Sequence, residues 1–213
     1  MMQRIRGARS YWRREPSLEP YDTVLIVCEG EKTEPGYLRA ARQAYRLSSV
    51  NINIIQSPGS DPMTIINYAD SELIRNGYDR AFCVFDEIGH ANFTAAMNKM
   101  GQLDSYKHGK LRPIISCPCF EIWVLLHYIY TTRSFVGTGK SLPCESVIRE
   151  LKKTYPTYAK NNPTMFSDLE DKLDDALNNA ARLHKYNVSS GSRNPSTEMH
   201  NLMTYLKELG PDV

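Results

Sequence analysis

The sequence lacks any long apolar run. No stretch approaches the roughly 18 consecutive apolar residues that a membrane-spanning helix needs. The first residues, MMQRIRGARSYWRRE, contain no apolar segment that could serve as the core of a secretory signal peptide. We therefore expect a soluble, cytoplasmic protein that makes no use of a membrane.

Cysteines with the usual metal-site spacing are missing too. The chain has five cysteines, and an odd count without an export signal predicts free thiols instead of a disulfide framework. Cys117 and Cys119, with His127 further along, invite comparison with a zinc site. Their spacing is shorter than that of a zinc knuckle and no second cysteine pair completes the set, so the sequence disfavours zinc.

The small net charge of +2 hides an uneven distribution of charge. Removing the arginines of the first 14 residues from the 26 basic residues leaves 21 against 24 acids. With Tyr11 and Trp12 among them, these arginines suit a segment that follows a phosphate backbone and stacks on a base. A solubilising tail, or a segment that packs on a partner, explains the arm equally well. The candidate nucleic-acid-binding residues of the arm are Arg4, Arg6, Arg9, Arg13 and Arg14.

Short apolar stretches alternate with helical patterns through the first two thirds of the chain. Such alternation predicts an α/β fold in which about four parallel strands form a sheet with helices on both faces. Asp61 followed by Pro62 is typical of a helix start. The predicted strands are 23–28, 50–55, 81–85 and 111–116, and the predicted helices between and after them are 37–46, 62–75, 92–106 and 120–130.

Beyond residue 130 only helical patterns are present, at 144–153, 166–186 and 195–209. Asn194, which precedes a proline, is a reasonable N-cap for the last helix. The sequence thus divides into a basic arm (1–20), an α/β core (21–130) and a C-terminal helical subdomain packed on that core (131–213).

Acidic residues follow the predicted strands where each strand ends. In an open α/β sheet ligands bind at this edge, and carboxylates gathered there repel one another unless a hard cation offsets their charge. We expect Mg²⁺ or Mn²⁺ there, clamping a phosphate and activating water, with Lys32 and His90 close enough to assist. The alternative is that each acid caps a helix. The acids are Glu29, Glu31, Glu34, Asp86, Glu87 and Glu121.

Other motifs carry less information. The segment SFVGTGKS at 134–141 ends like a P-loop but lacks the first glycine, which favours a flexible loop whose Lys140 touches phosphate, or a simple linker. Arg193 and Asn194, with Lys185 and Ser196, suit a phosphate at a helix N-terminus. His127 lies on an apolar helix and is expected to be a core histidine.

Four segments in order resemble the RloB-like family of bacterial proteins. They are VLIVCEGEKTEPGYL at 24–38, VFDEIGH at 84–90, IISCPCFEIWVLLHY at 114–128 and RNPSTEMHNL at 193–202. The resemblance implies a Toprim-like fold and an association with abortive infection and restriction loci. In Toprim-like enzymes a glutamate after the first strand and a D-x-D after the third hold Mg²⁺ for phosphodiester chemistry.

This resemblance assigns roles to particular residues. Glu29 matches the first-strand glutamate and Asp86 the first aspartate, while Glu34 and Glu121 match family acids. The second aspartate falls at Ile88, which cannot bind a metal. Glu87 or Glu121 is left to take its place.

The leading hypothesis is a Mg²⁺-dependent nuclease in phage defence. Its candidate metal ligands are Glu29, Asp86, Glu87 and Glu121, and its candidate catalytic residues are Glu29, Lys32, Glu34, His90 and Glu121. The alternative is a catalytically weakened module that binds nucleic acid or a partner ATPase. An oligomer is compatible with both.

Overall fold

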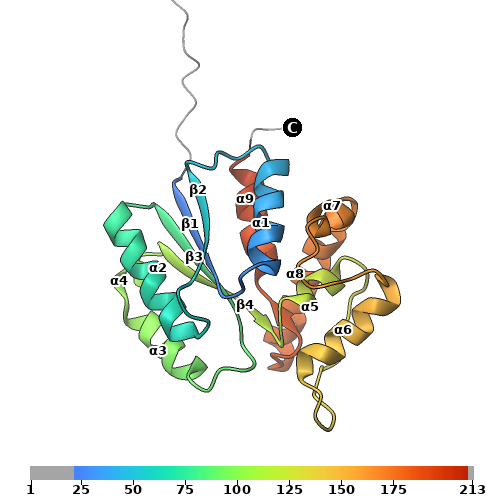
Figure 1. Cartoon of the computed structure of the whole chain (residues 1–213). Coiled ribbons are helices and arrows are strands. Elements are labelled where there is room, and N and C mark those ends of the chain that lie inside the picture. The colour runs from blue at the N-terminus through green and yellow to red at the C-terminus, as the bar shows by residue number, and fades with distance from the viewer. Residues whose placement is uncertain (1–21, 211–213) are drawn as a thin grey trace, which may run out of the picture.

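The computed structural model describes residues 22–210, in which five strands form one sheet in the order β2-β1-β3-β4-β5. The first four strands are parallel to one another, and β5 runs antiparallel beside β4. Figure 1 shows the sheet between two layers of helices. The strands are β1 (Val24–Cys28), β2 (Ile52–Gln56), β3 (Arg80–Asp86), β4 (Leu111–Cys117) and β5 (Ser196–Thr197).

The four predicted strands are confirmed, and the fifth was missed. Every residue of β1 is buried, as expected for a central strand of a parallel sheet that is covered on both faces. β5 contains only two residues, Ser196 and Thr197, and it pairs with the end of β4. A two-residue strand is too short to show an alternating pattern, which is why the predicted count of four falls short.

The helices overlap their predicted positions, but the predicted helix 92–106 is interrupted at Leu103 and the predicted helix 166–186 by a 3₁₀ turn. Asp61 caps α2, since its side chain accepts a hydrogen bond from the backbone N–H of Thr64 at 3.1 Å, and Pro62 occupies the first turn. The helices are α1 (Thr33–Ala44), α2 (Pro62–Asn76), α3 (Phe93–Gln102), α4 (Asp104–Lys107), α5 (Glu121–Leu126), α6 (Pro143–Thr154), α7 (Met165–Leu169), α8 (Leu173–Ser190) and α9 (Met199–Glu208), with a 3₁₀ turn η1 at Glu170–Lys172.

Alternate residues of each strand pack into two separate apolar cores, one on each face of the sheet. Val27 and Phe85 pack with α2 and α3 on one face, whereas Ile26 and Val84 pack with α1, α5 and α9 on the other. Figure 1 shows α2, α3 and α4 on one side of the sheet and α1 beside α9 on the opposite side. The second core continues into α6, α7 and α8. The last helix of the chain therefore covers the middle of the sheet.

Asn194 does not cap the last helix, so that prediction was wrong. The bond between Asn194 and Pro195 is cis, β5 follows, and α9 begins only at Met199. The side chain of Asn194 instead exchanges two hydrogen bonds with the backbone of Phe135, at 2.8 and 3.0 Å. The asparagine thus joins the loop before α6 to the turn before β5.

The expectation that all five cysteines are free thiols was also wrong. Cys119 and Cys144, 25 residues apart, form a disulfide between the turn before α5 and the first turn of α6. Cys28, Cys83 and Cys117 are free and buried. Sequence spacing gave no sign of the pair because the two cysteines belong to different elements.

Two further predictions concern membrane spans and the basic arm. None of the helices within residues 22–210 is long and apolar enough to cross a membrane. The arm with Arg4, Arg6, Arg9, Arg13 and Arg14 lies outside the described residues.

Candidate acidic site at the carboxyl edge of the sheet

Glu29 and Asp86 lie side by side at the carboxyl ends of β1 and β3. The parallel register sets Cys28 opposite Val84, and the backbone N–H of Glu29 donates to the Val84 carbonyl at 2.9 Å. The Glu29 carboxylate accepts a hydrogen bond from the backbone N–H of Asp86 at 3.0 Å. The two predicted metal ligands are therefore held together by the sheet itself.

Glu34 reaches the same edge from the first turn of α1. Its carboxylate packs directly against the turn after β1, so closely that a Cβ on Gly30 would collide with it. A side chain at position 30 would have to displace this carboxylate, which is the far end of a flexible side chain. The turn and the helix thus place Glu34 beside Glu29.

Glu121 is the most deeply buried acid of the site, with only 3% of its surface exposed. Its Oε1 accepts a hydrogen bond from the Tyr158 hydroxyl at 2.8 Å and lies 3.4 Å from Nζ of Lys160. Both partners come from the segment between α6 and α7. That segment therefore neutralises the buried carboxylate and anchors itself to the first turn of α5.

The negative charges of neighbouring carboxylates act on two acids of this cluster, Asp86 and Glu34. Burial raises the pKa of Asp86 well above its ordinary value, and the negative charges of Glu34, Glu29 and Glu121 raise it further. Burial also raises the pKa of Glu34, with Glu121 and Glu29 adding to the effect. A divalent cation placed among these groups would relieve both the burial cost and the repulsion.

His90 and Lys32 border the acids, as predicted. Nε2 of His90 lies 3.1 Å from Oε1 of Glu29, and both side chains are mostly buried. Lys32 is exposed at the start of α1 and lines a cavity of about 260 Å³ together with Glu34 and Lys160. Two lysines thus face a hollow that contains a carboxylate of the cluster. The cavity therefore presents positive charge beside the carboxylates.

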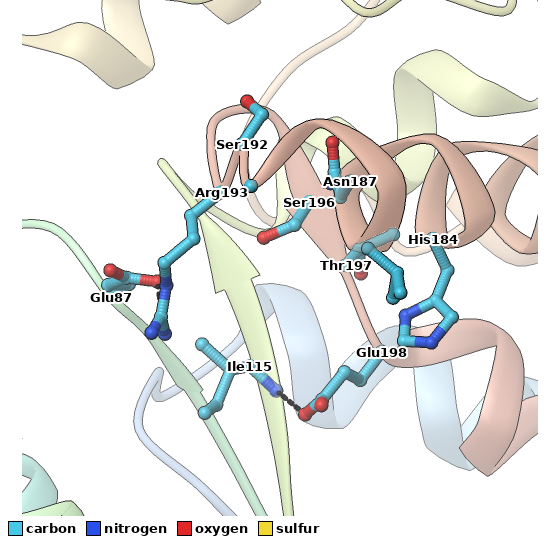
Figure 2. A pocket seen from close by; sticks show the side chains of 11 residues that line it. Glu87, Ile115, His184, Asn187, Ser192, Arg193, Ser196, Thr197 and Glu198 are labelled. Carbon is cyan, nitrogen blue, oxygen red and sulfur yellow. Dashed lines mark hydrogen bonds and ion pairs between the residues drawn. The ribbon is translucent and has the colours of Figure 1, made fainter.

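Glu87 is not brought together with the other acids. The ladder continues through its backbone, whose N–H donates to Ser116, so Asp86 and Glu87 point to opposite faces of the sheet. The Glu87 carboxylate pairs with Arg193 at 3.2 Å. Figure 2 shows this pair at the side of a separate pocket of about 310 Å³, in which Glu198 accepts a hydrogen bond from the backbone of Ile115.

Lys140 and His127 make no contact with the carboxylates of the site among the described residues. Lys140 is exposed in the loop before α6, and no strand precedes the SFVGTGKS segment, which therefore lacks the setting of a P-loop. His127 is a core histidine, as expected: it is 2% exposed, and its Nδ1 lies 2.9 Å from the Trp123 carbonyl oxygen.

Tyr158 and Lys160 were missed from the sequence. They lie in an irregular segment with no motif, and nothing in their spacing points to Glu121. The one available signal was the general preference of a buried carboxylate for a cationic or hydroxyl partner, which does not say where the partner lies in the chain.

The fold and the site define an α/β protein with a mostly parallel sheet and a cluster of carboxylates at the carboxyl ends of β1 and β3. The family description "RloB-like protein" matches residues 24–206. Since the match covers most of the chain, the protein belongs to the RloB-like family, and the resemblance seen in the sequence is confirmed. No curated protein and no solved structure matches the chain.

Proposed function

We propose that this protein is a divalent-metal-dependent nuclease of the Toprim-like type that acts in the bacterial cytoplasm in defence against phage. One observation carries the proposal. Carboxylates from four separate elements, two of them with pKa values raised by burial and by their neighbours, meet beside a cavity lined by two lysines. Membership of the RloB-like family supports the Toprim-like fold and the defence role.

The donor set fits Mg²⁺ or Mn²⁺. Both ions prefer oxygen ligands, and Mg²⁺ commonly takes one or two protein carboxylates and keeps several waters. Among the described residues these carboxylates do not form a tight set of three ligand atoms within 4.8 Å, so they do not resemble an all-protein cage. Glu29 and Asp86 would hold the ion, which when bound would polarise the phosphate and activate water.

The other residues have roles that follow from their contacts. Glu34, in contact with the cavity, is placed to complete the ligand set or to take the proton of the attacking water. His90 orients Glu29 through the 3.1 Å contact. Lys32 and Lys160 bind the phosphate backbone, and water adds to phosphorus as the bond to the bridging oxygen breaks. Glu121 supplies negative charge but is itself engaged by Tyr158.

The direct test is a cleavage assay on single-stranded DNA, duplex DNA and transfer RNA with Mg²⁺ or Mn²⁺. Cleavage by the wild-type chain should be lost on chelation and in the variants Glu29→Ala and Asp86→Ala. Asp175→Ala is the matched control, since it removes an exposed carboxylate from α8. Cleavage that persists in both site variants would rule out the assigned roles.

A second function is favoured by Ile88, which stands where the second metal-binding aspartate of a Toprim-like D-x-D is expected. Its side chain is apolar and 40% exposed. In this case the protein is a nucleic-acid-binding module that works with a partner ATPase. Calorimetry separates the two functions: nucleic-acid binding that falls steeply with salt, without binding of Mg²⁺ or Mn²⁺, would select the second.

A further inference from the structure

Cys119, Glu121 and Cys144 form the one group of three or more potential metal-ligating side chains within residues 22–210 whose ligand atoms all lie within 4.8 Å of one another. Cys119 and Glu121 are buried, and Cys144 is half-buried. The chain positions that meet here are the turn before α5, the first residue of α5 and the first turn of α6. Thiolate sulfur and carboxylate oxygen are both donor types that zinc accepts.

The two oxygens of Glu121 have different surroundings. Oε1 is contacted by the Tyr158 hydroxyl and by Lys160, whereas Oε2 faces Sγ of Cys144 at 3.2 Å. A disulfide sulfur carries no hydrogen, so in the oxidised form this contact cannot be a hydrogen bond. A buried carboxylate oxygen without a donor is costly, and the contact is better explained by a state in which the sulfurs and Oε2 share a partner.

We propose that, once the disulfide is reduced, Cys119, Cys144 and Oε2 of Glu121 bind one Zn²⁺. A thiol or phosphine reductant supplies two electrons and opens the S–S bond to two thiols. Zinc then binds the two thiolates as two protons are released. The site is separate in chemistry from the proposed Mg²⁺ site, because soft thiolates select zinc while carboxylates and water select magnesium.

The charges around this site balance. Two thiolates and one carboxylate carry three negative charges, so the zinc complex keeps one negative charge, which Lys160 at 3.4 Å from Glu121 offsets. Cys144 is in the first turn of α6, a twelve-residue helix whose N-terminal amides stabilise a thiolate. The three ligands leave the fourth position of a tetrahedral ion to water or to an added ligand.

Zinc at this position would replace the covalent link between α5 and α6 with a coordinate one. The bound ion would also fix the Oε2 side of Glu121, an acid that raises the pKa values of Glu34 and Asp86. The proposal concerns structure and metal content and does not require nuclease activity.

The test uses the full chain, reduced anaerobically with a phosphine and freed of metal. Zn²⁺ or Co²⁺ is added at one equivalent, unbound metal is removed by gel filtration, and the metal is counted by mass spectrometry. We expect one ion per chain, a thiolate-to-cobalt charge-transfer band, and a zinc-dependent loss of two reactive thiols that a chelator restores. Co²⁺ bound by carboxylates alone gives no such band, so the band distinguishes metal bound by the two cysteines from metal bound at the acidic site.

Variants locate the site. Cys144→Ser and Cys119→Ser should abolish the cobalt band, and Glu121→Gln should weaken zinc retention. Cys117→Ser is the matched control because Cys117 is a free, buried cysteine that does not belong to the group. Circular dichroism checks the folding of each. A wild-type chain that is reduced and folded but retains no zinc, a disulfide that resists the phosphine in the folded chain, or an unchanged band in Cys144→Ser would each overturn the proposal.

Discussion

Replacing His127 with glutamine should remove much of the protein's sensitivity to mild acid. The ring is 2% exposed, its Nδ1 donates to the Trp123 carbonyl, and its Nε2 lies 3.4 Å from the Tyr37 hydroxyl. Burial lowers the pKa of His127 from 6.5 to about 4. Both ring nitrogens are thus engaged in the neutral form, and the folded protein resists protonation of this side chain.

The sign and size of this effect on stability follow from the pKa of His127 in the unfolded and in the folded chain. Between pH 6.5 and about 4 the unfolded chain binds a proton at His127 that the folded chain does not, so stability present above pH 6.5 is lost as the pH falls. The contribution of His127 to the free energy of unfolding is about 2 kcal/mol smaller at pH 5 than at pH 7, since each pKa unit is worth about 1.4 kcal/mol.

The measurement is urea unfolding of the wild type and His127→Gln at pH 7 and at pH 5. The loss in unfolding free energy between the two pH values should be about 2 kcal/mol larger for the wild type. His108→Gln is the control because His108 is exposed, and it should behave as the wild type does. Equal losses in the wild type and His127→Gln would refute the reasoning.

Three further predictions concern the acidic site. Gly30→Ala should push the Glu34 carboxylate aside and weaken Mn²⁺ binding roughly tenfold in calorimetry, with little change in the urea midpoint. An unchanged affinity for Mn²⁺ would exclude a role of Glu34 in metal binding. Asp86→Asn should raise the unfolding free energy of the metal-free protein at pH 7. The reason is that the raised pKa of Asp86 makes wild-type stability fall as the pH rises above about 4. A variant no more stable than the wild type at pH 7 would contradict this. Lys160→Gln should reduce the slope of log affinity for nucleic acid against log salt by about one, and an identical slope would exclude a phosphate contact by Lys160.

The sequence predicted the sheet because local and global signals agreed. β1 and the middle of β3 are apolar runs and β2 alternates apolar with polar residues, and the helices between the strands carry recognisable starts such as Asp61 and Pro62. β5 has no such signal. It is defined by the pairing of Ser196 and Thr197 with β4, a tertiary contact that the local sequence does not encode.

The candidate site divides in the same way. Glu29 and Asp86 could be predicted to meet because the rule for strand ends depends only on strand order. Glu87 could not be separated from Asp86 until the ladder was known to continue through it. Lys160 and its contact with Glu121 depend on how an irregular segment folds back over α5, which no periodic pattern encodes.

The place of α9 in the chain has a consequence for biosynthesis. Met199, Leu202, Met203 and Leu206 are fully buried, and Tyr205 lies against Phe82 in the middle of the sheet. β1 and β3 end more than a hundred residues before Met199, and β4 ends at Cys117. A nascent chain consequently exposes part of one apolar side of its sheet until α9 has been translated, and we expect a product truncated before α9 to aggregate or to be degraded.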